Sequence, residues 1–349
     1  MINLISYPKT MTNTTSGPAR VGWIDALKGI GILTVAAGHI FPHPVAKYLY
    51  IFHMPLFFFI GGFLFKPSEN SREFFTKKAF HLLVPYVVFL CLIYVPCEVS
   101  EYLDNKESLK EAFARPVLGG RYLVGWCAVF WYITCFFLVQ QLMNYLVNNV
   151  KRTFIAWLMF VCLLISYALN RWLPSFWLPW NADVVFAAIP IFYTGYLYKS
   201  CQSEMAKFKW VWILMMAGAF VLTWYYPENI YEMKSGRYGI PFVTLLSALM
   251  IIFGLIEIAK LTEHSVFVSK PLSELGKASM IVMYLHQPVQ LIMLEHLSIT
   301  SPVLRFLVAV TVSMGGYYLL NNMEIGRALF LGSIADFRKI FGRNKLATV

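Results

Sequence analysis

Apolar runs of about 20 residues recur along almost the entire chain, and this recurrence restricts the fold more than any other feature. A helical run of that length crosses the hydrocarbon core of a bilayer. Because lipid offers no hydrogen-bond partner, each crossing segment must satisfy its backbone polar groups within its own helix. We therefore expect an all-α, polytopic integral membrane bundle of about ten transmembrane helices. The predicted spans are 23–40, 49–65, 80–98, 124–147, 153–170, 182–198, 209–226, 240–258, 278–297 and 302–320.

The composition and the distribution of charge agree with a membrane protein. Of the residues, 58% are hydrophobic and 13% are charged, whereas a soluble domain carries about 25% charged residues. The net charge of +11 would fit a nucleic-acid partner, but its distribution follows the membrane instead. If the N-terminus is cytoplasmic, 20 of the 29 Lys and Arg residues fall on the cytoplasmic side, while the acidic residues divide 9 and 9. This asymmetry predicts that both termini are cytoplasmic and that no nucleic acid binds.

The chain is expected to hold one membrane domain between two tails. Residues 1–20 are polar and rich in Ser and Thr, without the apolar core of a signal peptide, which predicts a disordered cytoplasmic tail. Residues 21–322 form the predicted transmembrane domain, and 323–349 form a basic cytoplasmic tail. The longest predicted loops are Val99–Leu123 outside and Lys66–Ala79 inside. Since no segment has the composition of a soluble catalytic domain, any chemistry must lie within the bundle or on these loops.

The first predicted span carries three ionisable side chains, which are costly in a membrane and therefore mark a candidate site. Lys28 and His39 are eleven residues apart, so they share one helix face within about 20° and are separated by about 16 Å along the axis. Asp25 lies one turn before Lys28 on the same side. Small residues, mainly glycine and alanine, keep the helix slim for the approach of a neighbour or a ligand. The alternative is an ion pair at one interface and a histidine at the other.

Two further histidines lie in other predicted spans. His53, near the outer boundary of the second span, could approach His39 or could be an interfacial capping group. His286 falls near the middle of the ninth span, where it could contact the substrate or form a hydrogen bond between helices. It belongs to a stripe with four- and three-residue spacing, which places the members on one helix face. The stripe consists of Ser279, Met283, His286 and Gln290.

A basic cluster precedes the third predicted span on the cytoplasmic side. It comprises Arg72, Lys77 and Lys78, followed by His81. Such clusters commonly reflect positive-inside topology or contact with anionic lipid headgroups. The alternative is a cradle for a phosphorylated cofactor, because Lys and Arg hold phosphates through charge-assisted hydrogen bonds. The outer loops are instead rich in Trp, Tyr and Pro, which suits interfacial anchoring or an aromatic platform for sugar rings.

Several familiar site motifs are absent from the sequence. There is no G-x-x-x-x-G-K-[ST] loop for a nucleotide, no H-E-x-x-H metalloprotease motif and no G-x-S-x-G elbow. The six cysteines show neither Cys-x-x-Cys spacing nor histidine partners, so no metal site is expected. An ATP-driven pump, a metalloprotease and an α/β-hydrolase are therefore disfavoured.

Five segments, taken in order, resemble the acyltransferase-3 family of bacterial membrane O-acyltransferases, in particular its branch similar to fucose 4-O-acetylases. They are Asp25-x-x-Lys28-Gly29 with His39, then FHMPLFFFIGGF, FFTKKAFHLLVPY, the WYI of residues 131–133, and LGKASMIVMYLHQP, which contains His286. The family's motif of Arg or Lys, ten residues, then His falls on Lys28 and His39. The chain departs from the family where Ile60-Gly61-Gly62 replaces the usual I-S-G, which removes a hydroxyl contact.

The resemblance implies a multi-pass enzyme of the bacterial inner membrane that transfers acetyl from cytoplasmic acetyl-CoA. The acceptor would be a hydroxyl of a surface polysaccharide or of its lipid-linked precursor. We expect His39 to act as general base, with His286 or His53 polarising the thioester or supporting the acceptor. An acetyl-histidine intermediate is the alternative to direct transfer. We expect the slender pantetheine arm of CoA to run beside the small residues of the first span.

The remaining expectations concern partners and the competing function. The CoA end of the donor is expected near Asp25, Lys28, Arg72, Lys77 and Lys78. The partners are then acyl-CoA, a carbohydrate or lipid-linked glycan and membrane lipid, with no oligomeric state assigned. A transporter or flippase for a glycan or small metabolite is the alternative, although the inverted repeats typical of transporters are not found. An acyltransferase for a non-sugar acceptor would carry the same first-span motif.

Overall fold

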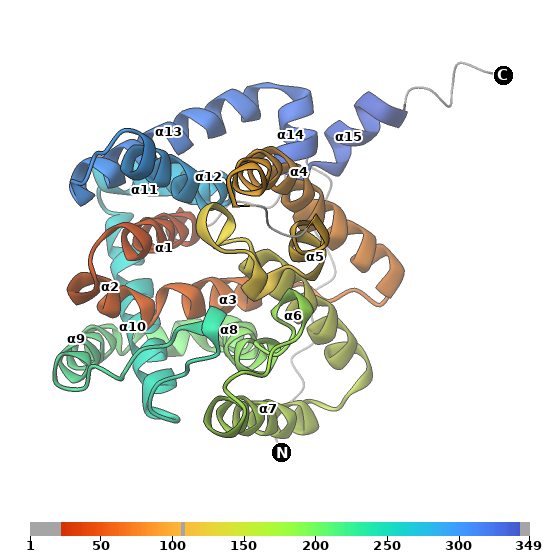
Figure 1. Ribbon diagram of the computed structural model, residues 1–349. Coiled ribbons are helices and arrows are strands. Elements are labelled where there is room, and N and C mark those ends of the chain that lie inside the picture. Colours follow the sequence, from red (N-terminus) through yellow and green to blue (C-terminus); the bar gives the residue numbers. More distant parts are fainter. Residues whose placement is uncertain (1–21, 106–108, 343–349) are drawn as a thin grey trace.

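The computed structural model describes residues 22–105 and 109–342, which form a bundle of helices without a β-sheet (Figure 1). The main helices are α1 (Gly22–Ile40), α3 (His53–Leu64), α4 (Ser71–Asn105), α6 (Trp131–Asn149), α7 (Arg152–Trp172), α8 (Val185–Ala206), α9 (Lys209–Tyr225), α10 (Val243–Thr262), α12 (Ser279–Leu291) and α13 (Pro302–Asn322). Further helices are α2 (His43–Tyr50), α5 (Leu109–Leu118), α11 (Val266–Lys277), α14 (Glu324–Phe330) and α15 (Ile334–Phe341). The tail predicted to be disordered, 1–20, lies outside the described residues.

Eight segments of the described chain are long and apolar enough to cross a membrane. They coincide with eight of the predicted spans, so the expected all-α, polytopic membrane bundle is confirmed. The other two predicted spans, 209–226 and 278–297, correspond to the 17-residue α9 and the 13-residue α12. After Pro288, α12 continues into a π-helical segment, η5 (Ile292–His296). Proline removes a backbone donor and so interrupts regular α-helical bonding at this point.

Two predicted loops prove to be largely helical. Helix α4 begins inside the predicted loop Lys66–Ala79, where Asn70 caps it by accepting a 3.1 Å hydrogen bond from the Glu73 amide. An ion pair of 2.6 Å between Glu73 and Lys77, one turn later, stabilises the same end. The predicted outer loop Val99–Leu123 contains the end of α4 and all of α5. The polar composition of residues 66–79 indicated a loop before the third predicted span. The Asn70 cap and the ion pair instead start α4 within this segment.

Helices α1 and α3 lie in the middle of the bundle, with α13 at one edge and α7 at the opposite edge (Figure 1). Most of α1 is buried inside the protein, whereas most of α13 is not. The outward faces of α7, α9 and α13 carry large exposed apolar side chains such as Trp157, Leu214 and Leu307. Lipid tails accept such side chains without cost. The outer helices therefore form a lipid-facing shell around α1 and α3.

The glycines of α1 make room for neighbouring helices rather than for a ligand. A Cβ atom added at Gly29 would lie 2.1 Å from the Leu272 carbonyl oxygen of α11, and one at Gly276 would lie 1.8 Å from the Asp25 carbonyl oxygen. Gly31 packs in the same way against side chains of α3. Small residues permit such close backbone approach between membrane helices. The face predicted to receive the pantetheine arm is thus filled by protein.

Short segments close the end of the bundle at which α1 reaches His39. They include the turns η1 (Gly120–Tyr122), η2 (Gly125–Cys127), η3 (Pro179–Asn181) and η4 (Met233–Ser235). The Lys234 carbonyl oxygen accepts hydrogen bonds from Arg121 Nε at 3.2 Å and from Asn181 Nδ2 at 3.0 Å. Three segments that are far apart in the sequence are thereby joined into one cap.

Candidate functional site

Three histidines from three helices gather at the end of α1. The His39 and His286 ring centroids are 5.5 Å apart, so α1 and α12 each present an imidazole to the other. The Tyr50 ring centroid of α2 lies 6.1 Å from that of His39 and 4.9 Å from that of His53 of α3. The sequence predicted that His53 could approach His39, and in the structure one tyrosine ring contacts both. The site is therefore a chain of four rings at one end of the bundle.

Backbone carbonyls determine which nitrogen of two of these imidazoles carries the proton. His53 Nδ1 lies 2.7 Å from the Leu49 carbonyl oxygen, and His286 Nδ1 lies 2.8 Å from that of Val282. A carbonyl only accepts, so each Nδ1 must donate. In the neutral ring Nε2 then carries the lone pair, and His286 Nε2 is buried without a hydrogen-bond partner. Both rings are thus fixed as acceptors toward the site.

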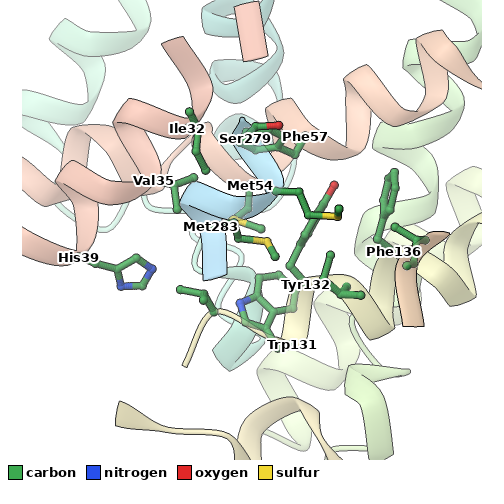
Figure 2. Close-up of a pocket in the computed structure, with 14 residues that line it drawn as sticks. Ile32, Val35, His39, Met54, Phe57, Trp131, Tyr132, Phe136, Ser279 and Met283 are labelled. Atoms are coloured by element: carbon green, nitrogen blue, oxygen red, sulfur yellow. The ribbon is translucent and has the colours of Figure 1, made fainter. Parts of the chain in front are cut away.

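His39 differs from the other two histidines because its ring nitrogens have no hydrogen-bond partner among the residues that the structure describes. Instead the ring faces a narrow space of about 140 Å³, named here the apolar cavity. Figure 2 shows His39 at one end of this cavity and Phe136 at the other, with Met54 and Met283 between them. Such a volume is below the range of pockets that hold whole drug-sized ligands. It suits a slender chain.

One face of α1 forms a wall of the apolar cavity. Ile32, Val35 and His39 all line the cavity, and Lys28 precedes Ile32 by four residues. These four residues follow the four- and three-residue spacing of a single helix face. The predicted common face of Lys28 and His39 is therefore the face that carries the cavity, on a side of α1 different from the glycine that packs against α11.

A second and wider space of about 390 Å³, named here the polar pocket, also contains His39 in its wall. Its other polar wall residues come from α2, α3 and the cap. They are Tyr50, His53, Arg121, Glu232, Lys234 and Ser235. His39 is thus shared by an apolar cavity that follows α1 toward Lys28 and a polar pocket that lies beneath the cap.

Polar groups also gather beyond the wall residues Ile32 and Leu82, on the side named here the Lys28 end of the apolar cavity. Lys28 Nζ and Asp25 Oδ1 are 3.5 Å apart and form an ion pair. Lys28 lies one helical turn before Ile32 of α1, and Lys78 lies one turn before Leu82 of α4. Ile32 and Leu82 both line the cavity, so these two predicted basic residues each lie one turn from its wall.

The remaining members of the predicted basic cluster point elsewhere. The Lys77 ammonium pairs with Glu73 at 2.6 Å, and its side chain is 64% exposed. Arg72 is exposed in the first turn of α4. Lys78 instead lies over the Phe74 ring, with its Nζ 5.4 Å from the ring centroid. Only Lys78 of this cluster is directed toward the protein.

The predicted stripe on α12 lies on one side of the helix, as expected. Ser279 and Met283 line the apolar cavity, and His286 faces His39. Gln290 accepts a 2.7 Å hydrogen bond from Arg305 Nη1 of α13. Arg305 was not predicted as part of the site, because its place near the start of a span resembles an interfacial residue. The arginine is buried, so it fixes α13 against α12.

The sequence also gave no indication of the charged residues of the polar pocket. Arg121 belongs to one connection and Glu232 and Lys234 to another, and Arg121 Nη2 lies 3.3 Å from Asp183 Oδ2 of a third connection. No spacing rule relates residues of different loops. A charged residue in an outer loop is ordinarily solvated, so composition gave no signal either.

The described residues contain no group of three His, Cys, Asp or Glu side chains arranged to hold a metal ion. Comparison with known proteins shows one match to a family, described as an acyltransferase domain, over residues 21–322. No curated protein shows a significant match to the chain, and no solved structure does. The matched range contains all three histidines, both spaces and the basic residues at the Lys28 end.

Proposed function

The chain belongs to the acyltransferase-3 family, and from that membership we propose that it is a membrane O-acetyltransferase. It moves acetyl from cytoplasmic acetyl-CoA to a hydroxyl of a surface polysaccharide or of its lipid-linked precursor. The location follows as the bacterial inner membrane, with both termini cytoplasmic. The resemblance to fucose 4-O-acetylases supports a sugar acceptor.

One observation carries this proposal: His39 belongs to the walls of both the apolar cavity and the polar pocket. Acetyl transfer from CoA to a sugar needs two substrates of opposite character that meet at one proton acceptor. A thioester at the end of a slender arm suits the apolar cavity. A sugar, which is rich in hydroxyl groups, suits the polar pocket.

The proposed step begins with the acceptor hydroxyl held against His39. The imidazole takes the hydroxyl proton while the hydroxyl oxygen attacks the thioester carbonyl carbon. The C–S bond then breaks, and the proton on His39 passes to the departing CoA sulfur. The products are the acetyl ester and free CoA thiol, so the imidazole ends as it began.

His53 and His286 receive a narrower role in this scheme. Each donates its Nδ1 proton to a backbone carbonyl, so the neutral ring has only a lone pair to offer at Nε2. Polarising a thioester carbonyl requires a donor. We therefore assign them to accepting hydrogen bonds from the sugar or from His39, rather than to stabilising the oxyanion.

The CoA phosphates are assigned to the Lys28 end of the apolar cavity. Lys78 supports this assignment best, because it lies one turn before Leu82 of α4, as Lys28 lies one turn before Ile32 of α1, and both Leu82 and Ile32 line the cavity. Asp25 pairs with Lys28 and orients it. Arg72 and Lys77 lie further out on α4, where anionic lipid headgroups reach them at the membrane surface.

Exchanging Lys78 for methionine is expected to raise the KM for acetyl-CoA about tenfold, because one charge-assisted hydrogen bond to a phosphate is lost. Lys77→Met is the matched control, since it removes the same charge one residue away from a side chain that points outward. Initial rates at varied acetyl-CoA in lipid nanodiscs provide the measurement. An equal rise in KM in both variants would show that only the general surface charge matters.

The kinetic mechanism is expected to be sequential, with both substrates bound before acetyl is transferred. Because the two spaces share the wall residues His39, Met54 and Trp131 and otherwise have separate walls, donor and acceptor are able to bind together. Double-reciprocal plots at several acceptor concentrations should intersect. Parallel lines, together with an acetylated protein detected by mass spectrometry in the absence of acceptor, would instead establish the acetyl-histidine route.

The function itself is tested by acetyl analysis of surface glycans. A strain that lacks the gene should produce glycan with less O-acetyl, and the wild-type gene should restore it, whereas a His39→Ala gene should not. A transporter or flippase predicts a different result. Its loss would reduce the amount of glycan at the surface while leaving the acetyl content per sugar unchanged.

A further inference from the structure

The polar pocket holds more charge than a site for a neutral sugar requires. Two of its charged residues are neutralised within the protein. Arg121 pairs with Asp183 at 3.3 Å, and Glu232 pairs with Arg237 while also accepting a 2.9 Å hydrogen bond from the Ser235 hydroxyl. Both pairs therefore contribute little net charge to the pocket.

Lys234 is the third charged wall residue, and it takes part in neither of these two ion pairs. Its Nζ donates a 2.6 Å hydrogen bond to the Leu123 carbonyl oxygen. Within the part of the chain that the structure describes, no carboxylate lies within ion-pair distance of this ammonium group. An ammonium has three donors, so two N–H groups remain beyond the bond to Leu123.

Holding the Lys234 ammonium group in its charged form at this place is unfavourable unless a ligand binds it. Burial lowers the pKa of Lys234 to about 8, and the nearby Glu232 and Cys127 offset this effect only in part. A buried charge ordinarily has a partner of opposite sign. Lys234 has a carbonyl, which carries no net charge.

The ammonium group also lies close to the reacting end of the site. Lys234 and His39 are both wall residues of the polar pocket. A molecule that reaches His39 from the cap side therefore passes within the influence of Lys234.

We propose that the polar pocket recognises an acceptor sugar that bears an anionic group, a carboxylate or a phosphate, and that Lys234 binds this group. The inference rests on the proposed function, since it assigns the acceptor side of the same transfer. The anionic group supplies a partner of opposite charge for Lys234. With that group held in place, the distance from Lys234 to His39 selects which hydroxyl is acetylated. A carboxylate points to a uronic-type sugar and a phosphate to a sugar phosphate or a lipid-linked precursor.

The two hydrogen bonds that join Lys234 to η1 and η3 use its backbone, so a purely structural role would largely survive a substitution of the side chain. Arg121 and Asn181 both donate to the Lys234 carbonyl oxygen, which a side-chain substitution leaves in place. Among the described residues, the bond from Nζ to the Leu123 carbonyl oxygen is the one hydrogen bond that the Lys234 side chain makes. Lys234→Met therefore removes the charge while most of the cap remains joined.

Binding of small probes to the protein in nanodiscs, without acetyl-CoA, tests the proposal. The probes are methyl β-glucoside, methyl β-glucuronide and glucose 1-phosphate at constant ionic strength, and calorimetry gives each Kd. We expect at least one anionic probe to bind about tenfold more tightly than the glucoside, which corresponds to one charge-assisted hydrogen bond. Comparison of the glucuronide with the phosphate identifies the anionic group.

Variants then connect this preference to Lys234. Lys234→Met should abolish the preference for the anionic probe, and Lys234→Arg should retain it, with thermal unfolding recorded to establish that each variant is folded. Lys47→Met is the matched control, because Lys47 lies on α2 over the Tyr48 and Trp224 rings and is not a wall residue of the pocket. Its preference should be that of the wild type.

Three results would overturn the inference: equal binding of all three probes, no binding of either anion, or an equal loss in the Lys47 variant. Because these measurements need no acetyl-CoA, they are independent of catalysis. Tight binding of an anionic sugar by a protein that never transfers acetyl would contradict the proposed function and leave the anion site intact. Acetyl transfer without a preference for an anionic probe would support the proposed function and contradict the anion site.

Discussion

His39→Ala is expected to lower the rate of acetyl transfer by about 10² to 10⁴, the range that a positioned general base contributes. His39, Met54 and Trp131 line both the apolar cavity and the polar pocket, and of these three side chains only the imidazole is able to take the hydroxyl proton. Its ring nitrogens make no hydrogen bond within the described residues. Removing them therefore leaves no buried partner unsatisfied, and the fold should be retained.

The control for this experiment is His43→Ala. His43 is the first residue of α2, at the same end of the bundle, and it is exposed and absent from the walls of both spaces. Transfer of labelled acetyl from acetyl-CoA by the purified variants gives the rates, and thermal unfolding shows whether each is folded. A His39 variant that transfers acetyl at the wild-type rate would remove this residue from the chemistry.

The largest effect on stability is expected from Gly276→Ala. The new Cβ would lie 1.8 Å from the Asp25 carbonyl oxygen, and neither backbone is able to move without separating α1 from α11. Overpacking of a well-packed contact costs about 1–3 kcal/mol and more when backbone atoms must move. We expect destabilisation of about 3 kcal/mol or more, together with loss of activity, because α1 carries His39.

Gly315→Ala provides the matched comparison in α13. A Cβ atom at Gly315 has no neighbour within 4 Å, so the substitution should change stability by no more than about 1 kcal/mol. Thermal unfolding in the same nanodiscs, followed by tryptophan fluorescence, measures both variants. Similar transitions for the two would show that the α1–α11 contact is looser than the structure indicates.

The predictions that succeeded from sequence alone are those that depend on helical periodicity. The spacing of Lys28 and His39 predicted one common face, and that face of α1 lines the apolar cavity. The spacing on α12 likewise placed Ser279, Met283 and His286 on one side. A regular helix fixes the relative direction of its side chains, so no knowledge of the neighbours is needed.

The sequence was less informative wherever a neighbour decides the outcome. The slim face of α1 was open to either a helix or a ligand, and contact with Leu272 of α11 decides for the helix. The segment before the third predicted span has a polar composition that suggests a loop, yet the Asn70 cap and the pair of Glu73 with Lys77 make most of it the start of α4. In each case the deciding contact involves particular atoms rather than composition.

The sequence by itself determined the membrane class, the helical bundle and the shared face of Lys28 and His39, because bilayer thickness and helix geometry act on each segment separately. Only the tertiary structure decided that His39 belongs to two spaces, and that Arg121 and Lys234 complete the wider one. The residues of the polar pocket come from connections far apart in the chain. Their approach depends on how the helices pack, and no periodicity within any one segment encodes it.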